Sequence, residues 1–152
     1  MEVIPSGPGL RHLRDTMTHP ISNASAATVP SILRAEVAAG HEPALDRPRS
    51  DRLESGNPLR HTWSVYEAPQ GDLSVGLWAC EVGRWRIVFP ESKDEYFFVL
   101  EGVVRLHDKT GAFTEFRAGQ GGVIPGGFEG AFEVVEPVRK HFVVLDRAAA
   151  HL

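Results

Sequence analysis

The amino-acid sequence predicts an all-β domain of the sandwich or barrel type. Short stretches rich in Val, Ile, Phe, Trp and Tyr follow one another from His61 to Leu145, and turn residues separate them. No run with helical periodicity lies between these stretches. Closely spaced glycines bound two blocks of this region, one ending at Gly102 and the other beginning at Gly119. These observations favour a single β-barrel formed by residues 61–146.

About nine strands are expected within this region. The apolar stretches that predict them cover residues 62–66, 73–80, 84–89, 95–100, 103–107, 113–116, 121–124, 131–135 and 139–145. The sequence Asp-Lys-Thr-Gly at residues 108–111 separates two of these stretches and is typical of a hairpin turn. Residues 103–116 are therefore expected to form a β-hairpin.

Residues 1–60 are expected to form an extended N-terminal arm. Its first part is rich in Pro, Gly, Ser, Thr and Ala and lacks a sustained apolar period, which predicts partial disorder. A short helix is expected at residues 31–39, because Ser31 can cap it and Gly40 can end it. Residues 147–152 are expected to be a frayed C-terminal tail. The sequence leaves open whether translation starts at Met1 or Met17.

The composition excludes several classes of function. The 152 residues include 16 basic and 20 acidic side chains, which gives a net charge of −4 without a basic run. We therefore expect neither a nucleic-acid partner nor attraction to an anionic membrane. No apolar run reaches 18 residues, and no hydrophobic signal segment is evident, so a cytoplasmic location is expected. Cys80 has no cysteine partner and apolar neighbours, which predicts a buried thiol.

Two glycine-framed motifs carry a resemblance to a known family. The first has the spacing of the cupin motif G-x5-H-x-H-x3-E-x6-G, with Gly83, Phe89, Glu91, Glu95 and Gly102 at the named positions. The second has the spacing of G-x5-P-x-G-x2-H-x3-N, with Gly119, Pro125, Gly127, Gly130 and Val134. The chain thus resembles a small single-domain cupin. This resemblance implies a double-stranded β-helix, the jelly roll of the RmlC-like cupin barrel.

Within the cupins, the chain resembles the (S)-ureidoglycine aminohydrolase-type domain. The phrases Val-Gly-Leu-Trp at residues 75–78 and Val-Ile-Pro-Gly-Gly-Phe at residues 123–128 carry this likeness. Metal-binding cupins use three histidines and one glutamate. Here Phe89, Glu91 and Gly130 stand at the histidine positions, and only Glu95 matches a ligand position. A transition metal needs more protein ligands than this, so we expect no metal and no cofactor.

Strand periodicity predicts which side chains face the barrel interior. The candidate ligand-binding residues are Trp78, Trp85, Phe89, Phe97, Phe132, Lys140 and His141. An aromatic-lined cavity with a few polar groups is typical of a small-molecule site. The alternative is that the aromatic side chains fill the barrel as core, that Lys140 is solvated and that His141 is an ordinary strand residue.

Glu91 and Glu95 are the candidate catalytic residues. Two carboxylates inside an apolar barrel would repel each other, and such a pair can act as general acid and base. The alternative for Glu91 is a solvent-exposed position in the loop that contains it. We therefore expect a metal-free cupin that binds a small organic ligand inside the barrel, and leave open a ureidoglycine aminohydrolase-like hydrolase, an acid–base isomerase or a purely structural protein. Because cupin dimers often exchange an N-terminal strand, the long arm also suggests a homodimer.

Overall fold

The computed structural model of the chain describes residues 29–149. Nine strands and one short 3-10 helix lie within these residues, and none of the described helical structure is long and apolar enough to cross a membrane. The elements are β1 (Ala44–Asp46), β2 (Leu53–Ser55), β3 (Arg60–Glu67), β4 (Leu73–Cys80), β5 (Gly83–Val88), β6 (Lys93–Asp108), β7 (Phe113–Arg117), β8 (Gly121–Ile124), β9 (Glu129–Asp146) and η1 (Arg147–Ala149).

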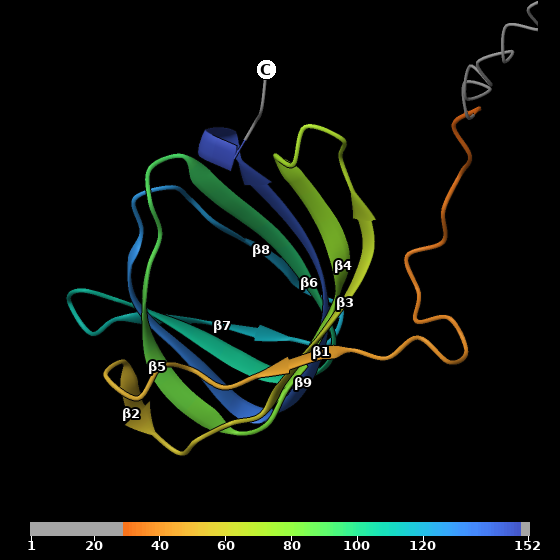
Figure 1. Ribbon diagram of the computed structural model, residues 1–152. Helices are drawn as coiled ribbons and strands as arrows, with labels where there is room; N and C mark the ends of the chain where they lie inside the picture. Colours follow the sequence, from red (N-terminus) through yellow and green to blue (C-terminus); the bar gives the residue numbers. More distant parts are fainter. Residues whose placement is uncertain (1–28, 150–152) are drawn as a thin grey trace, which may run out of the picture. The chain divides into compact units, whose positions relative to one another are not determined.

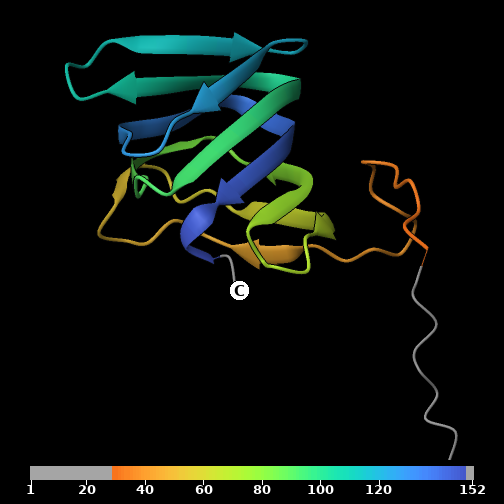
Figure 2. The ribbon, with the colours of Figure 1, turned by 90° about the horizontal axis from the view of Figure 1, so that it is seen from above.

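The strands curl into an antiparallel barrel (Figure 1). Along one path the order is β1-β3-β4-β9-β5-β2, and β6 pairs with β7, β8 and β9. The two longest strands, β6 and β9, pair along most of their length and connect the two halves of the barrel. Viewed from above, β7 and β8 lie at one end of the barrel and β1 at the opposite end (Figure 2). The predicted all-β jelly roll is confirmed.

Strands β6 and β9 each unite two predicted strands. The sequence predicts that strands end after Leu100 and after Val135. In the structure, both strands continue past these positions as single bent strands. The β6–β9 register shifts at three places between Val99 and Val104, so the break becomes a series of bulges. Gly102 lies there with φ of 88°, and a Cβ atom at this position would collide with the carbonyl oxygen of Pro137. The glycine thus permits the bend without ending the strand.

The second half of the predicted arm belongs to the barrel sheet. Strand β1 pairs with β3 and strand β2 pairs with β5, so residues 44–55 contribute two edge strands. The predicted helix at residues 31–39 is wrong, because this stretch contains only bends and the start of a turn. Ile32 is 99% exposed and Leu33 is 55% exposed, so the apolar stripe of that helix has no surface to pack against. The predicted disorder before residue 29 and the Met17 start lie outside the described residues.

The core follows the alternation of side chains along β6 and β9. On β9 the buried residues are Phe132, Val134, Val138, Lys140 and Phe142, together with the small Ala131, and the remaining residues are more exposed. The even-numbered side chains of this strand therefore face the interior. Cys80 is also buried, as predicted, and burial raises the pKa of its thiol to about 12. One member of this buried series, Lys140, is charged.

Candidate functional site

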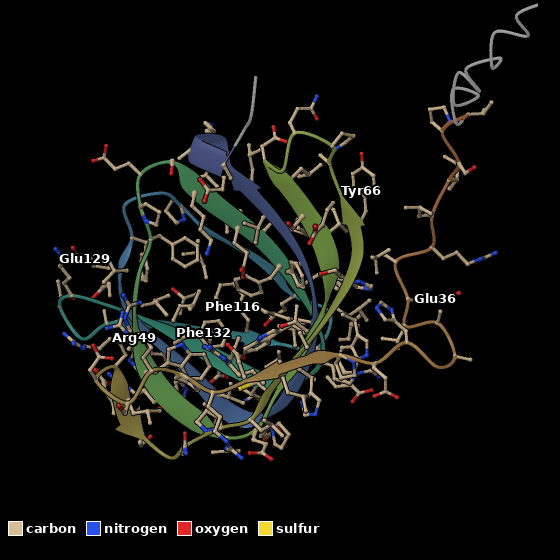
Figure 3. All side chains as sticks on the ribbon, in the orientation of Figure 1. Glu36, Arg49, Tyr66, Phe116, Glu129 and Phe132 are labelled. Carbon is tan, nitrogen blue, oxygen red and sulfur yellow. The ribbon has the colours of Figure 1, made fainter. Side chains whose placement is uncertain are left out.

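A cavity of about 390 Å³ opens into the barrel beside Lys140. It is bounded by the β1–β2 segment and by side chains of β3, β4, β5, β6, β8 and β9. Aromatic and aliphatic side chains form about half of its wall. They are Pro48, Trp78, Trp85, Ile87, Val88, Phe89, Ile124, Phe132, Phe142 and Val144. Phe132 is seen inside the barrel in Figure 3, and Arg49 lies near its edge.

Lys140 and Glu95 form a buried ion pair at the cavity. The Lys140 Nζ atom donates a hydrogen bond of 2.8 Å to Glu95 Oε2, and the two side chains are only 5% and 13% exposed. The register of β6 and β9 explains why Lys140 and Glu95 meet. Lys140 pairs with Val99, and Glu95 lies four residues before Val99 on the same face of β6. Each charge thereby provides the partner that the other needs for burial.

Aromatic rings surround the ammonium group of Lys140. Its Nζ atom lies 4.7 Å from the ring centroid of Trp78, and 5.0 Å from those of both Phe97 and Phe132. Cation–π attraction at these distances holds the ammonium group against the rings. The Lys140 ammonium group is therefore held in place by the aromatic wall as well as by Glu95.

The aromatic wall is built from facing positions of neighbouring strands. Trp85 on β5 lies directly opposite Phe132 on β9, and their rings stack with centroids 5.2 Å apart. Trp78 meets the edge of Phe132 at 5.5 Å. Such contacts hold the rings in defined orientations. The wall is therefore a preformed apolar surface next to the ion pair.

Arg60 adds a second cation to the same wall. Its guanidinium carbon lies 5.4 Å from the ring centroid of Trp85, and the group forms an ion pair with Asp46 on β1. Asp46 on β1 thus holds in place the Arg60 guanidinium group, which extends from β3 toward the cavity. Sequence analysis missed Arg60. The one sequence signal for a position at the cavity is that Arg60 lies two residues before Thr62 on β3. The two side chains therefore share a strand face, and both line the cavity.

The structure brings together most of the predicted site residues. Six of them line the cavity: Trp78, Trp85, Phe89, Glu95, Phe132 and Lys140. Phe97 is fully buried beneath the Lys140 ammonium and packs edge-on against Phe116, so it belongs to the core. Its placement matches the core alternative.

Two predicted residues lie away from the cavity. His141 follows Lys140 on β9, and its side chain projects to the opposite face because neighbouring strand residues alternate. Glu91 is exposed in the segment before β6 and does not line the cavity. The structure therefore does not unite Glu91 with Glu95 as two carboxylates in one site.

The cupin motif positions do not provide a set of metal ligands. Among residues 29–149, no group of three or more His, Cys, Asp and Glu side chains is arranged to hold a metal ion. Glu95 is the only motif carboxylate at the cavity, and one of its oxygens already accepts a hydrogen bond from Lys140. Gly130 has no side chain, and a Cβ atom there would collide with the His107 carbonyl oxygen. A divalent cation does not fit beside the Lys140 ammonium.

Comparison with protein families identifies the barrel. The family model of the EutQ-like cupin domain matches residues 67–142. The chain belongs to this family. The match covers half of the sequence and includes the strands that carry Trp78, Glu95 and Lys140. Among curated proteins, none is similar enough to this chain to match it.

Solved structures agree with the cupin fold. A protein of unknown function from Pseudomonas syringae pv. tomato, of the DUF861 family, has 22% identity and a TM-score of 0.60, and the match covers 67% of this chain and 43% of that protein. The EutQ protein of Clostridium difficile has 22% identity and a TM-score of 0.52, over 66% of this chain and 80% of that one. A putative ethanolamine utilization protein Q of Salmonella typhimurium has 18% identity and a TM-score of 0.53, over 70% and 97%. This chain spans less than half of the P. syringae protein.

Proposed function

We propose that this cupin-domain protein binds a small organic ligand inside its barrel. The observation that carries the proposal is the cavity of about 390 Å³, with stacked aromatic walls and a buried Lys140–Glu95 pair. Ligand sites typically have about 300–1,000 Å³ of space, a largely apolar lining and a few polar groups that orient the ligand. The cavity has a volume in this range and aromatic walls, together with charged side chains that can orient a ligand.

A substitution that fills the cavity tests this proposal. Thr62 lines the cavity and is half-buried, so Thr62→Phe should occupy the space. Thr114 on β7 is exposed and lies outside this cavity, which makes Thr114→Phe the matched control. We expect ureides, amino acids or sugar acids to raise the melting temperature of the native protein and of Thr114→Phe, but not of Thr62→Phe. Equal responses of all three proteins, or no response to the panel, would contradict ligand binding in the barrel.

Glu95 favours a second candidate function, a hydrolase of the ureidoglycine aminohydrolase type or an acid–base isomerase. It is the one predicted catalytic carboxylate that lines the cavity, and Lys140 lies within hydrogen-bond distance of it. A carboxylate paired with an ammonium group can exchange protons with a bound substrate. Under this candidate, Glu95→Gln abolishes turnover of any substrate that the binding panel identifies, while ligand binding persists. Unchanged turnover would exclude Glu95 as acid or base.

We also propose that the protein forms a homodimer. Tyr96 and Val123 are neighbours across β6 and β8, and they are 47% and 62% exposed. Apolar side chains that adjoin on a strand surface are suited to contact with a second copy. Sedimentation equilibrium of the full chain should give twice the monomer mass, and Val123→Lys should shift the population toward monomer. A purely monomeric native protein would contradict the proposal.

A further inference from the structure

The cavity has a surplus of positive charge. Six basic side chains and two acidic ones line it. The basic residues are Arg49, Arg52, Arg60, Arg86, Lys93 and Lys140, and the acidic ones are Asp46 and Glu95. The whole chain is acidic, with a net charge of −4, so this surplus is local. A concave surface lined by one sign of charge concentrates its field and attracts ligands of the opposite sign.

Three of these cations lie over aromatic rings of the cavity wall. Lys140 is 4.7 Å from the ring centroid of Trp78, and Arg60 is 5.4 Å from that of Trp85. Lys93 at the start of β6 lies 4.5 Å from the ring centroid of Phe89. The rings hold the charged groups against the apolar wall, so that positive charge and aromatic surface border the same space.

These cations differ in how fully they are neutralised. Glu95 neutralises Lys140 at the buried end of the cavity, and Asp46 pairs with Arg60 while remaining 58% exposed. Within residues 29–149, neither Lys93 nor Arg52 has a carboxylate within 4 Å. The cavity therefore retains hydrogen-bond donors and positive charge for an anion at Arg52 and Lys93, whereas Lys140 and Arg60 already have carboxylate partners.

We infer that the ligand is an organic anion, a carboxylate or a phosphate monoester with an apolar body. This inference rests on the proposed function, since it specifies the chemistry of the ligand in the same cavity. The acidic group lies near Arg52 or Lys93, whose guanidinium and ammonium groups line the cavity without a carboxylate partner among the described residues and can form charge-assisted hydrogen bonds. The apolar body lies against the stacked Trp85 and Phe132 rings. A cationic ligand is disfavoured because the surplus positive charge repels it.

Four probes that share a phenyl ring separate charge from shape. Benzoate and phenyl phosphate carry an acidic group, benzyl alcohol is neutral, and benzylamine is cationic. We expect isothermal titration of the full chain at low ionic strength to give at least tenfold tighter binding for an anionic probe than for benzyl alcohol, and no binding of benzylamine. Added salt should weaken the binding of the anionic probes much more than the binding of benzyl alcohol. The stronger of the two anions then identifies the acidic group.

Matched variants locate the anion. Arg52→Gln and Lys93→Gln should each weaken binding of the anionic probe by about tenfold, as expected for a lost charged hydrogen bond. Arg105 lies 4.7 Å from the Phe113 ring, outside this cavity, and Lys109 pairs with Glu129. Arg105→Gln and Lys109→Gln remove the same charges elsewhere and should leave binding unchanged.

Each outcome is decisive. If benzyl alcohol or benzylamine binds as tightly as the anions, the inference about charge is overturned while ligand binding in the barrel stands. If no probe binds and the wider panel gives no thermal shift, both proposals fail. If the anions bind but neither Arg52→Gln nor Lys93→Gln weakens their binding, the assignment of the anion to these two residues is overturned.

Discussion

Charged side chains are arranged differently on the two faces of the barrel wall. On the outer face, Arg84, Glu133, Arg105 and Glu115 occupy paired positions on β5, β9, β6 and β7, so that charges of opposite sign alternate from strand to strand. Arg105 contacts both Glu115, at 2.9 Å, and Glu133, at 3.7 Å. The cavity on the inner face instead has six basic and two acidic side chains.

This difference separates a structural use of charge from a binding use. Opposite charges in facing positions satisfy one another across a sheet, and they stabilise it modestly. A set of charged side chains with a surplus of one sign stabilises the fold less. Its unpaired charges remain available to bind a ligand of the opposite sign. The outer row of charges, which consists of Arg84, Glu133, Arg105 and Glu115, is therefore neutralised within the chain. The surplus positive charge of the cavity is instead suited to binding an anion from outside the chain.

The largest expected effect comes from breaking the Lys140–Glu95 ion pair, the least exposed ion pair among the described residues. Lys140→Met keeps the length of the side chain but leaves Glu95 buried without its cation. We expect a loss of about 3–5 kcal/mol in the free energy of unfolding, measured by urea denaturation. The double variant Lys140→Met/Glu95→Gln should recover a large part of this loss, because no unpaired charge remains. Additive effects of the two substitutions would show that the 2.8 Å contact contributes no coupling.

A smaller effect is expected from the outer row. Arg105 and its partner Glu115 are 34% and 25% exposed, so water screens their attraction. Arg105→Gln should lower the free energy of unfolding by at most about 1 kcal/mol, and the difference should shrink as salt is added. The same urea titrations at two salt concentrations measure it. A loss as large as that of Lys140→Met would contradict the distinction between the two faces.

The smallest effect is expected at Asp94, which belongs to neither set. A hydrogen bond from the Gly126 backbone N–H and the nearby Arg147 guanidinium lower the pKa of this carboxyl group below its usual 3.8. Its charged form therefore stabilises the fold above about pH 4, and the contribution is lost as the pH falls through the lowered pKa. Asp94→Asn should lower the melting temperature slightly at pH 7, and this difference should shrink as the pH falls from 7 through the lowered pKa. A constant difference across this range would exclude the charge of Asp94 as the cause.

The barrel could be predicted from the sequence because its signals are local. Alternating apolar residues predicted most of the strands, and the glycine spacing predicted the fold, which the family match confirms. Period-two alternation also placed Phe97, Val99, Phe132 and Val134 correctly at the barrel interior. The merging of strands into β6 and β9 was missed, because Gly102 is compatible with either a turn or a bulge, and only pairing with β9 decides between them.

The charged part of the site was harder to predict. Arg52 lies between β1 and β2, whose three-residue strands are too short to show an alternating pattern. Arg60 is the first residue of β3 but also the last residue of the predicted arm. Glu91 has the correct motif spacing, yet its backbone carbonyl packs where a Gly126 Cβ atom would lie, and its side chain is exposed. Residues that meet through long-range packing leave no signal in spacing alone.

Strand β9 carries both arrangements of charge, since Glu133 lies on its outer face and Lys140 on its inner face. The parity of this one strand thus assigns each residue to its environment. One extra residue inserted between them would turn the lysine toward solvent and bring Arg139 and His141 toward the barrel interior in its place. In the course of evolution, β9 can accept substitutions one at a time far more readily than a change of a single residue in length.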